Sequence, residues 1–162
     1  IFHYRLVPWN VPEKMNFQRN LLVAFICYLL KCIPVQRGGD RSSVKSTLDK
    51  CSHLLRMKEN LMIFPEGTRS RNGRINTEEF SYGVGRLLVN NPECRVMCLY
   101  LRGDGQDTYS NFPKRNEIFT MEIQECKPET QLKGLRAQRD CAKQIVTCLA
   151  KMEKNYFDTC GK

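Results

Sequence analysis

Hydrophobic and polar residues follow one another along this chain with periods that predict alternating strands and helices. Short apolar runs at 32–35 ("CIPV"), 60–64 ("NLMIF") and 95–101 ("RVMCLYL") are typical of strands in a sheet. In 117–125 ("EIFTMEIQE"), apolar residues stand at every second position, which predicts a half-buried strand.

Apolar residues at intervals of three and four predict helices between these strands. The spacing indicates helices at 13–30, at 44–58 and, despite two glycines, at 80–89. A glycine-rich turn precedes the second helix, and Asp40 or one of the serines after it can cap that helix. The last 25 or so residues form an amphipathic helix that packs on a sheet. Its apolar positions are Leu135, Ala142, Ile145, Leu149, Met152 and Tyr156.

The order of these elements predicts an α/β fold with a mixed, partly parallel sheet flanked by helices. The chain has 162 residues, of which 41% are hydrophobic and 27% charged, and this composition suits a globular domain with its own core. No repeat, low-complexity stretch or linker divides it. We therefore expect residues 1–162 to form a single domain.

The charge balance points to an anionic partner. Lysine and arginine number 26 against 17 acidic residues, which leaves a net charge of +9. Nucleic acid, acidic lipid headgroups and phosphorylated small molecules all fit this charge. The 9 cysteines are scattered without a CxxC pair, and neither His3 nor His53 completes a zinc spacing. We expect no metal, and cysteines that serve as small buried side chains.

One stretch, "LMIFPEGTRSRNGRI" at 61–75, has the composition of a binding turn. It follows a predicted strand, and ligands in α/β sheets bind at the carboxyl ends of strands. Gly67 lets the backbone approach a ligand, Arg69 can bind phosphate through two parallel hydrogen bonds, and Glu66 among arginines is expected to stay ionised. Arg37 follows the earlier strand 32–35 in the same manner. The alternative is that both are solvated surface turns.

The segment "FPEGTRS" resembles the signature of the glycerolipid acyltransferases, the family of the lysophosphatidic acid acyltransferases. "CIPVQR" and "CRVMCLYL" are similar to two further blocks of that family, and the resemblance covers roughly residues 9–130. "PWNVPEKMNF" and "YGVGRLL" resemble the tafazzin branch, although tafazzins usually lack the full "GTRS" ending. The resemblance implies the glycerolipid acyltransferase-like fold, here lacking its N-terminal part.

The resemblance also implies a reaction in phospholipid biosynthesis. A fatty acyl group passes from acyl-CoA or acyl carrier protein, as co-substrate, to the hydroxyl of a phosphorylated glycerol or lysophospholipid such as 1-acylglycerol 3-phosphate, without a further cofactor. The substrate-binding residues that it implies are Arg37, Phe64, Pro65, Glu66, Gly67, Thr68, Arg69 and Ser70.

The family uses a histidine as general base, oriented by an aspartate five residues later, and this chain departs from that pattern. Five residues after His3 stands Pro8, and five after His53 stands Lys58. We expect the catalytic pair to lie upstream of Ile1 in a longer protein. The chain alone is therefore expected to be inactive as an acyltransferase.

Membrane association is expected at the surface, without a span. The run 21–30 is too short to cross a bilayer, so it forms either a core helix or a helix in the membrane interface. We expect a peripheral or interfacially anchored protein on the cytoplasmic side. A non-catalytic module that binds anionic lipid or phosphate is the alternative. Nucleic-acid binding ranks last, because the basic residues are dispersed and no aromatic–basic motif accompanies them.

Overall fold

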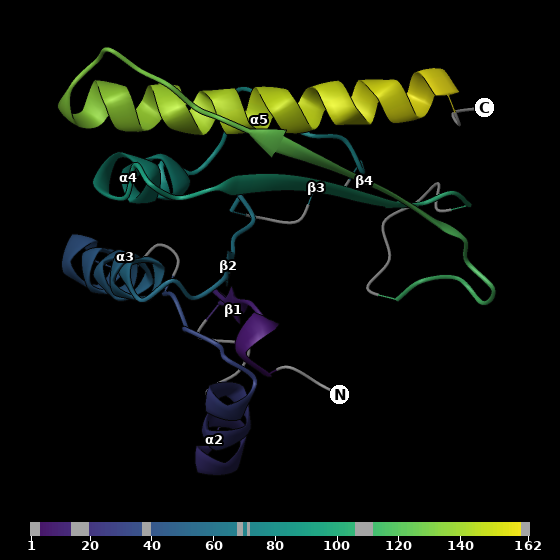
Figure 1. The fold of residues 1–162 in the computed structure, drawn as a ribbon. Coiled ribbons are helices and arrows are strands. Elements are labelled where there is room, and N and C mark those ends of the chain that lie inside the picture. The colour runs from purple at the N-terminus through teal and green to yellow at the C-terminus, as the bar shows by residue number, and fades with distance from the viewer. Residues whose placement is uncertain are drawn as a thin grey trace. The chain divides into compact units, whose positions relative to one another are not determined.

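The structure, a computed structural model, describes residues 4–13, 20–36, 40–67, 70, 72–105 and 112–159. Two compact units divide the chain. The first, unit 1, comprises residues 1–63 with 90–92, and the second, unit 2, comprises residues 64–89 with 93–162. Helices and strands alternate as the sequence predicts, and the described residues confirm a mixed α/β fold flanked by helices (Figure 1).

Unit 1 contains a small parallel sheet. Strand β1 (Trp9–Asn10) pairs in parallel with β2 (Leu61–Met62). On its other side, Asn10 and Glu13 form isolated parallel bridges to Cys32 and Val35. A 3-10 turn, η1 (Tyr4–Leu6), precedes β1. The predicted strand at 60–64 is thus present in shorter form, whereas the one predicted at 32–35 is reduced to two isolated bridges. The parallel pairing confirms the partly parallel sheet.

Two helices complete unit 1, α2 (Leu21–Leu29) and α3 (Arg41–Arg56). The Asp40 side chain caps α3 by accepting a 2.7 Å hydrogen bond from the Ser43 N–H, as the sequence predicts. The prediction of a helix from residue 13 is wrong at its start. Glu13 is in the extended bridge to Val35, and Asn20 caps α2 by accepting from the Val23 N–H at 2.8 Å.

Both helices end in the same hydrogen-bonded motif, with a lysine in the left-handed conformation. After α2, Lys31 has φ +53°, and the N–H of Cys32 donates to the Cys27 carbonyl. After α3, Lys58 has φ +59°, and the N–H of Glu59 donates to Leu54. This is the Schellman pattern, whose left-handed position usually holds glycine. A specific reason is therefore expected for the buried lysine, Lys31.

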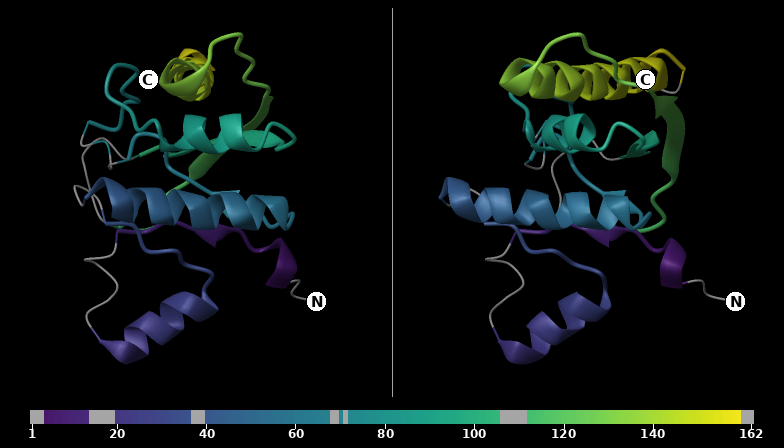
Figure 2. Two further views of the ribbon diagram at one scale, coloured as in Figure 1. Left: turned by 90° about the vertical axis from the view of Figure 1, so that its left-hand side faces the viewer. Right: turned by 60° about the vertical axis from the view of Figure 1, so that its left-hand side comes forward.

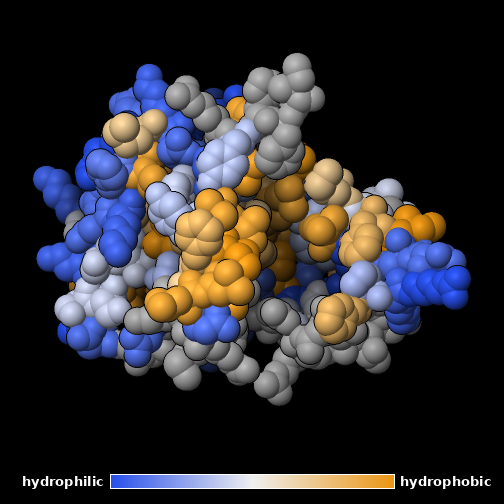
Figure 3. All heavy atoms as spheres, turned by 90° about the horizontal axis from the view of Figure 1, so that it is seen from below, coloured by the Kyte–Doolittle hydropathy of each residue, from blue (hydrophilic) through white to orange (hydrophobic). Residues whose placement is uncertain are grey.

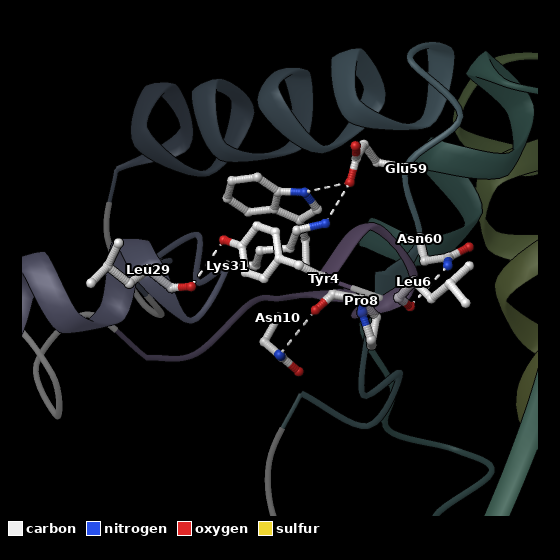
Figure 4. A network of polar contacts seen from close by, with 9 residues as sticks. Tyr4, Leu6, Pro8, Asn10, Leu29, Lys31, Glu59 and Asn60 are labelled. Atoms are coloured by element: carbon white, nitrogen blue, oxygen red, sulfur yellow. Dashed lines mark hydrogen bonds and ion pairs between the residues drawn. The ribbon is translucent and has the colours of Figure 1, made fainter. Parts of the chain in front are cut away.

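Figure 4 shows such a reason for Lys31. Its side chain is only 4% exposed, and its ammonium lies 2.7 Å from Glu59 Oε2. The Trp9 indole N–H donates to the same oxygen at 3.2 Å, and the ammonium lies 4.9 Å from the centre of the Tyr4 ring. The Tyr4 hydroxyl in turn donates to the Leu29 carbonyl at 2.9 Å. The buried charge is thereby paired and shielded, and it ties the end of α2 to β1 and to Glu59 beyond α3.

Unit 2 is built on an antiparallel strand pair. Strand β3 (Val96–Gly103) pairs with β4 (Phe119–Cys126) over eight residues each. The long helix α5 (Gly134–Thr159) packs on this pair and runs along β3 in Figure 1, and the left-hand view of Figure 2 looks down its axis. Helix α4 (Gly83–Asn90) precedes β3. The core lies between α5 and one face of β3. It consists of Cys98, Tyr100, Ile145, Met152 and Tyr156.

The other face of the β3–β4 pair is apolar and exposed. The prediction that β4 turns its apolar residues inward is wrong, because α5 covers the opposite face. The residues concerned are between 47% and 57% exposed: Met97, Leu99, Leu101, Phe119, Met121 and Ile123. The predicted alternation of residues along β4 is therefore confirmed, whereas the expectation that its apolar face is the buried one is wrong.

Helix α4 approaches α5 closely through a glycine. A Cβ atom on Gly85 would lie 1.8 Å from the carbonyl oxygen of Gln138 and 3.0 Å from the backbone nitrogen of Ala142. Only a residue without a side chain fits at this crossing. The glycine that weakens the helix prediction at 80–89 is thus the residue that allows the helix to pack.

Candidate functional site

Two backbone hydrogen bonds fold the turn at 64–67. The Gly67 N–H donates to the Phe64 carbonyl at 3.1 Å, and the Ser81 N–H donates to the Pro65 carbonyl at 2.8 Å. Gly67 has φ +70°, the left-handed conformation that favours glycine. Its added Cβ would meet Ser81 only at an ordinary 3.7 Å, so backbone conformation, and not space, requires the glycine.

Glu66 is half-buried in this turn, and its surroundings raise the pKa of its carboxyl. Burial is the largest cause, and the nearby charge of Glu153 adds to it. Hydrogen bonding with the Asn76 backbone acts in the opposite direction. The sequence predicts an acid held in its ionised form by arginines, whereas the net shift found for Glu66 favours the protonated form.

After the turn, Ser70 forms hydrogen bonds with Asn72 and Arg74. Its hydroxyl donates to Asn72 Oδ1 at 2.7 Å, and the Arg74 N–H donates to Ser70 Oγ and to Asn72 Oδ1, both at 3.0 Å. The Ser70 hydroxyl therefore supports the loop in this conformation. A second role in holding a ligand would compete with the bond to Asn72.

A cluster of charged and aromatic residues that sequence reasoning missed lies against this loop. The Arg74 and Arg102 guanidinium carbons lie 3.9 and 4.8 Å from the centre of the Phe157 ring. Glu153, buried in α5, accepts a 3.1 Å hydrogen bond from the Ile75 N–H and lies 3.8 Å from Arg74 Nε. Arg102 also donates to the Gly73 carbonyl at 2.6 Å.

Sequence signals for this cluster were present but ambiguous. Arg74 belongs to the arginine-rich stretch, and Arg102 comes directly after the strand predicted at 95–101. Glu153 follows Met152 on the long helix and breaks its apolar face, which is a recognisable sign of a buried acid with a partner. Their proximity depends on packing between elements far apart in sequence.

A buried hydroxyl without a hydrogen-bond partner in the described part of the chain belongs to Tyr100. Burial raises its pKa, whereas nearby Arg102 acts in the opposite direction. Its neighbour Tyr156 is satisfied, because that hydroxyl donates to Asp104 Oδ1 at 3.0 Å.

The structure describes part of the predicted substrate-binding set. Phe64, 66% exposed, lies in the turn with Pro65, Glu66 and Gly67. Arg37, Thr68 and Arg69 lie outside the described residues. The expected roles of Arg37, Thr68 and Arg69 in substrate binding therefore stay predictions.

Neither histidine gains a catalytic setting within the described residues. His3 lies outside them. His53 is exposed on α3 and lines a hollow of about 610 Å³ in unit 1, together with Trp9, Ile33 and Asp49. Asp49 precedes His53 by four positions on the helix, the reverse of the predicted order.

Comparison with known proteins assigns the family. Residues 1–101 match the family model described as Acyltransferase. No curated protein and no solved structure matches the chain. Because the matched segment covers more than half of the 162 residues and includes the whole 64–70 turn, the chain belongs to the acyltransferase family.

Proposed function

We propose that this chain binds the phosphorylated acceptor in a glycerolipid acyl transfer. The acceptor class is a lysophospholipid such as 1-acylglycerol 3-phosphate, and the donor is acyl-CoA or acyl carrier protein. The proposed setting is phospholipid biosynthesis at the cytoplasmic face of a membrane. Because the chain has no His-x-x-x-x-Asp pattern, the proposal gives it substrate binding and assigns no general base to its residues.

The geometry of the 64–67 turn carries this proposal. Its glycine, Gly67, has the left-handed conformation, and Thr68 and Arg69 follow it in the sequence. A guanidinium there could donate two parallel hydrogen bonds to a phosphate. Arg74 and Arg102 on the same unit add positive charge beside the loop. The basic balance of the whole chain favours an anionic ligand as well.

Helix α2 supports the proposed membrane surface. In the view of Figure 3, hydrophobic residues gather over this helix. The residues exposed there, between 44% and 91%, are Leu21, Leu22, Phe25, Ile26, Tyr28, Leu29 and Leu30. No helix within the described residues is long and apolar enough to span a bilayer. An exposed apolar helix of nine residues suits the headgroup region of one leaflet.

Binding to lipid vesicles tests the acceptor site without requiring turnover. The chain is titrated with phosphatidylcholine vesicles that contain lysophosphatidate and with vesicles that lack it. Arg69→Ala should weaken the lysophosphatidate-dependent part roughly 10- to 100-fold, since a charge-assisted hydrogen-bonded pair contributes about 1.5–3 kcal/mol. Arg37→Ala should act in the same direction.

Arg136→Ala is the matched control, because it removes the same charge from an exposed position in the first turn of α5. It should lower binding to all anionic vesicles slightly and equally. If Arg69→Ala behaves like Arg136→Ala, the acceptor-site assignment is wrong and only general electrostatic attraction remains.

A second candidate function is a non-catalytic module for anionic lipid. The observation that favours it is the missing histidine–aspartate pattern. A protein that includes the natural sequence flanking this chain is assayed for release of free CoA from acyl-CoA in the presence of lysophosphatidate. Acyl transfer supports the first function, whereas arginine-dependent binding without transfer supports the second.

A further inference from the structure

Three cysteines from three different elements of unit 2 meet in space. Cys98 lies on β3, Cys126 at the end of β4 and Cys148 on α5, and their Sγ atoms all lie within 4.8 Å of one another. They are separated by 28 and 22 positions in the sequence, so no short motif reveals them. We propose that this three-thiol cluster is a binding site for a trivalent thiophilic centre, with arsenic(III) as its ligand.

The strand register disfavours a direct disulfide between Cys98 and Cys126. Cys98 pairs with Gln124 and Cys126 with Val96, so the two cysteines are diagonal neighbours on the face that carries α5. Diagonal residues in an antiparallel pair lie roughly 7–8 Å apart. The Cα atoms of a disulfide are usually closer, at about 4.4–6.8 Å. A central atom bonded to all three sulfurs spans such a gap more readily than a direct S–S bond.

The apolar surroundings of the three-thiol cluster limit the net charge that a bound complex can carry. Cys98 belongs to the apolar core with Tyr100, Ile145 and Met152, and Cys126 and Cys148 pack against that core, as do Val96 and Leu149. Because these surroundings are apolar, a bound state with net negative charge is disfavoured there.

Charge balance then distinguishes the candidate ions. Three thiolates on copper(I) carry two negative charges, and three thiolates on zinc(II) carry one and leave zinc without its usual fourth ligand. Three thiolates on arsenic(III) are neutral and fill its coordination. Of these three centres, only arsenic(III) leaves no charge in the apolar core.

The binding step is balanced without an oxidant or reductant. Arsenous acid, As(OH)₃, exchanges its three hydroxyl groups for the three Sγ atoms. Three As–O and three S–H bonds break, three As–S bonds form, and each thiol proton leaves with a hydroxide as water. Arsenic stays trivalent throughout. Cys126 and Cys148 are half-buried, so the small neutral reagent can reach the cluster from their side before it engages buried Cys98.

Intact-protein mass spectrometry tests this proposal directly. The chain is incubated with sodium arsenite in a buffer whose reductant is a phosphine without thiols. The expected product gains one arsenic atom and loses three hydrogens. Binding by only two thiols would retain a hydroxyl group on arsenic and give a different mass. X-ray absorption of the wild-type complex should show three sulfur neighbours and no oxygen.

Variants locate the site. Cys126→Ala and Cys148→Ala should each abolish the three-thiol product and weaken arsenic binding roughly 100-fold, the usual size of the gain from an added tethered contact. Cys141→Ala is the control, because it removes a buried thiol from the same helix outside the cluster. Circular dichroism checks that each variant is folded.

Either of two results would overturn the proposal. One is wild-type protein that binds no arsenic or binds it with an As–O neighbour. The other is equal three-thiol binding by the Cys126→Ala or Cys148→Ala variant. Zinc binding to the same cysteines, with affinity similar to that of arsenite, would contradict the argument from charge.

Discussion

The carboxylate of Glu153 accepts a hydrogen bond from the backbone N–H of Ile75 at 3.1 Å, across 78 positions of sequence. The bond attaches the loop that follows the 64–67 turn to α5. Because Glu153 is only 7% exposed, it has few alternatives to this partner and to Arg74. The position of the loop therefore depends on a buried acid in the long helix.

Removing that acid should free the loop. We expect Glu153→Ala to lower the free energy of unfolding by about 1–3 kcal/mol, since it leaves the Ile75 N–H without its acceptor. Glu153→Gln keeps an acceptor oxygen and should lower the free energy of unfolding by a smaller amount. Urea titration compares them, and hydrogen exchange at the Ile75 amide should accelerate in the alanine variant only. Equal exchange rates in both variants would contradict the role of this bond.

Glu66 should make stability depend on pH in the acid range. Its folded-state pKa is raised above the ordinary 4.5, so the folded protein binds the proton more tightly than the unfolded chain does. The stabilising effect is fully present below pH 4.5 and is lost as the pH rises through the folded pKa. Glu66→Gln should remove this part of the pH dependence. Urea titrations over a pH series measure it, and an unchanged profile in the variant would refute the assignment.

The charge of Glu153 contributes to that shift, so Glu153→Gln should lower the pKa of Glu66. The carboxyl chemical shift of Glu66, followed by NMR through a pH titration, reports it directly. Asp140→Asn, which removes an acid more than three helical turns from Glu153 on α5, is the control and should leave the titration of Glu66 unchanged.

Gly85→Ala should be strongly destabilising. The added carbon would fall 1.8 Å from the Gln138 carbonyl oxygen, a backbone atom that cannot rotate away. We expect a loss of about 3 kcal/mol or more, at the upper end of overpacking effects. Gly134→Ala is an informative comparison, since its φ of +62° is strained but nothing lies within 4 Å of the added atom. Thermal unfolding should show the larger loss for Gly85→Ala.

The two left-handed lysines should respond oppositely to glycine. Lys58→Gly relieves the backbone conformation of an exposed residue and should stabilise the protein by up to about 1 kcal/mol. Lys31→Gly relieves the same strain but removes the ammonium that pairs with Glu59, and it should destabilise by about 3 kcal/mol or more. Chemical denaturation measures the free energy of unfolding of both variants. If both substitutions stabilise the protein, the Lys31 ion pair contributes little.

Local patterns in the sequence predicted most of the helices and strands. The features that the sequence did not predict depend on packing between residues far apart in the chain. The Asp40 cap and the alternation of β4 depend only on residues close together in the sequence, so the sequence was enough to predict them. The side on which β4 is buried depends on α5, which packs only against the face with Cys98 and Tyr100. Nothing in the alternation of Met121 and Ile123 contains that information.

The same distinction applies to the candidate site. Contiguous residues identified the turn at 64–70, and Gly67 has the positive φ that such a turn requires. Arg102 and Glu153 reach the loop from β3 and α5, and no spacing rule links them to Ser70 or Arg74. A sequence reading finds such neighbours only when the packing of strand and helix is already known.

The membership of Asn91 in unit 1 constrains the order in which the chain can fold during synthesis. The buried hydroxyl of Ser52 and the side-chain amide of Asn91 exchange hydrogen bonds of 2.9 and 3.2 Å. A nascent chain that has emerged only as far as β2 lacks this partner, and Ser52 must stay hydrated. Unit 1 therefore reaches its final form only after α4, an element of unit 2, has left the ribosome.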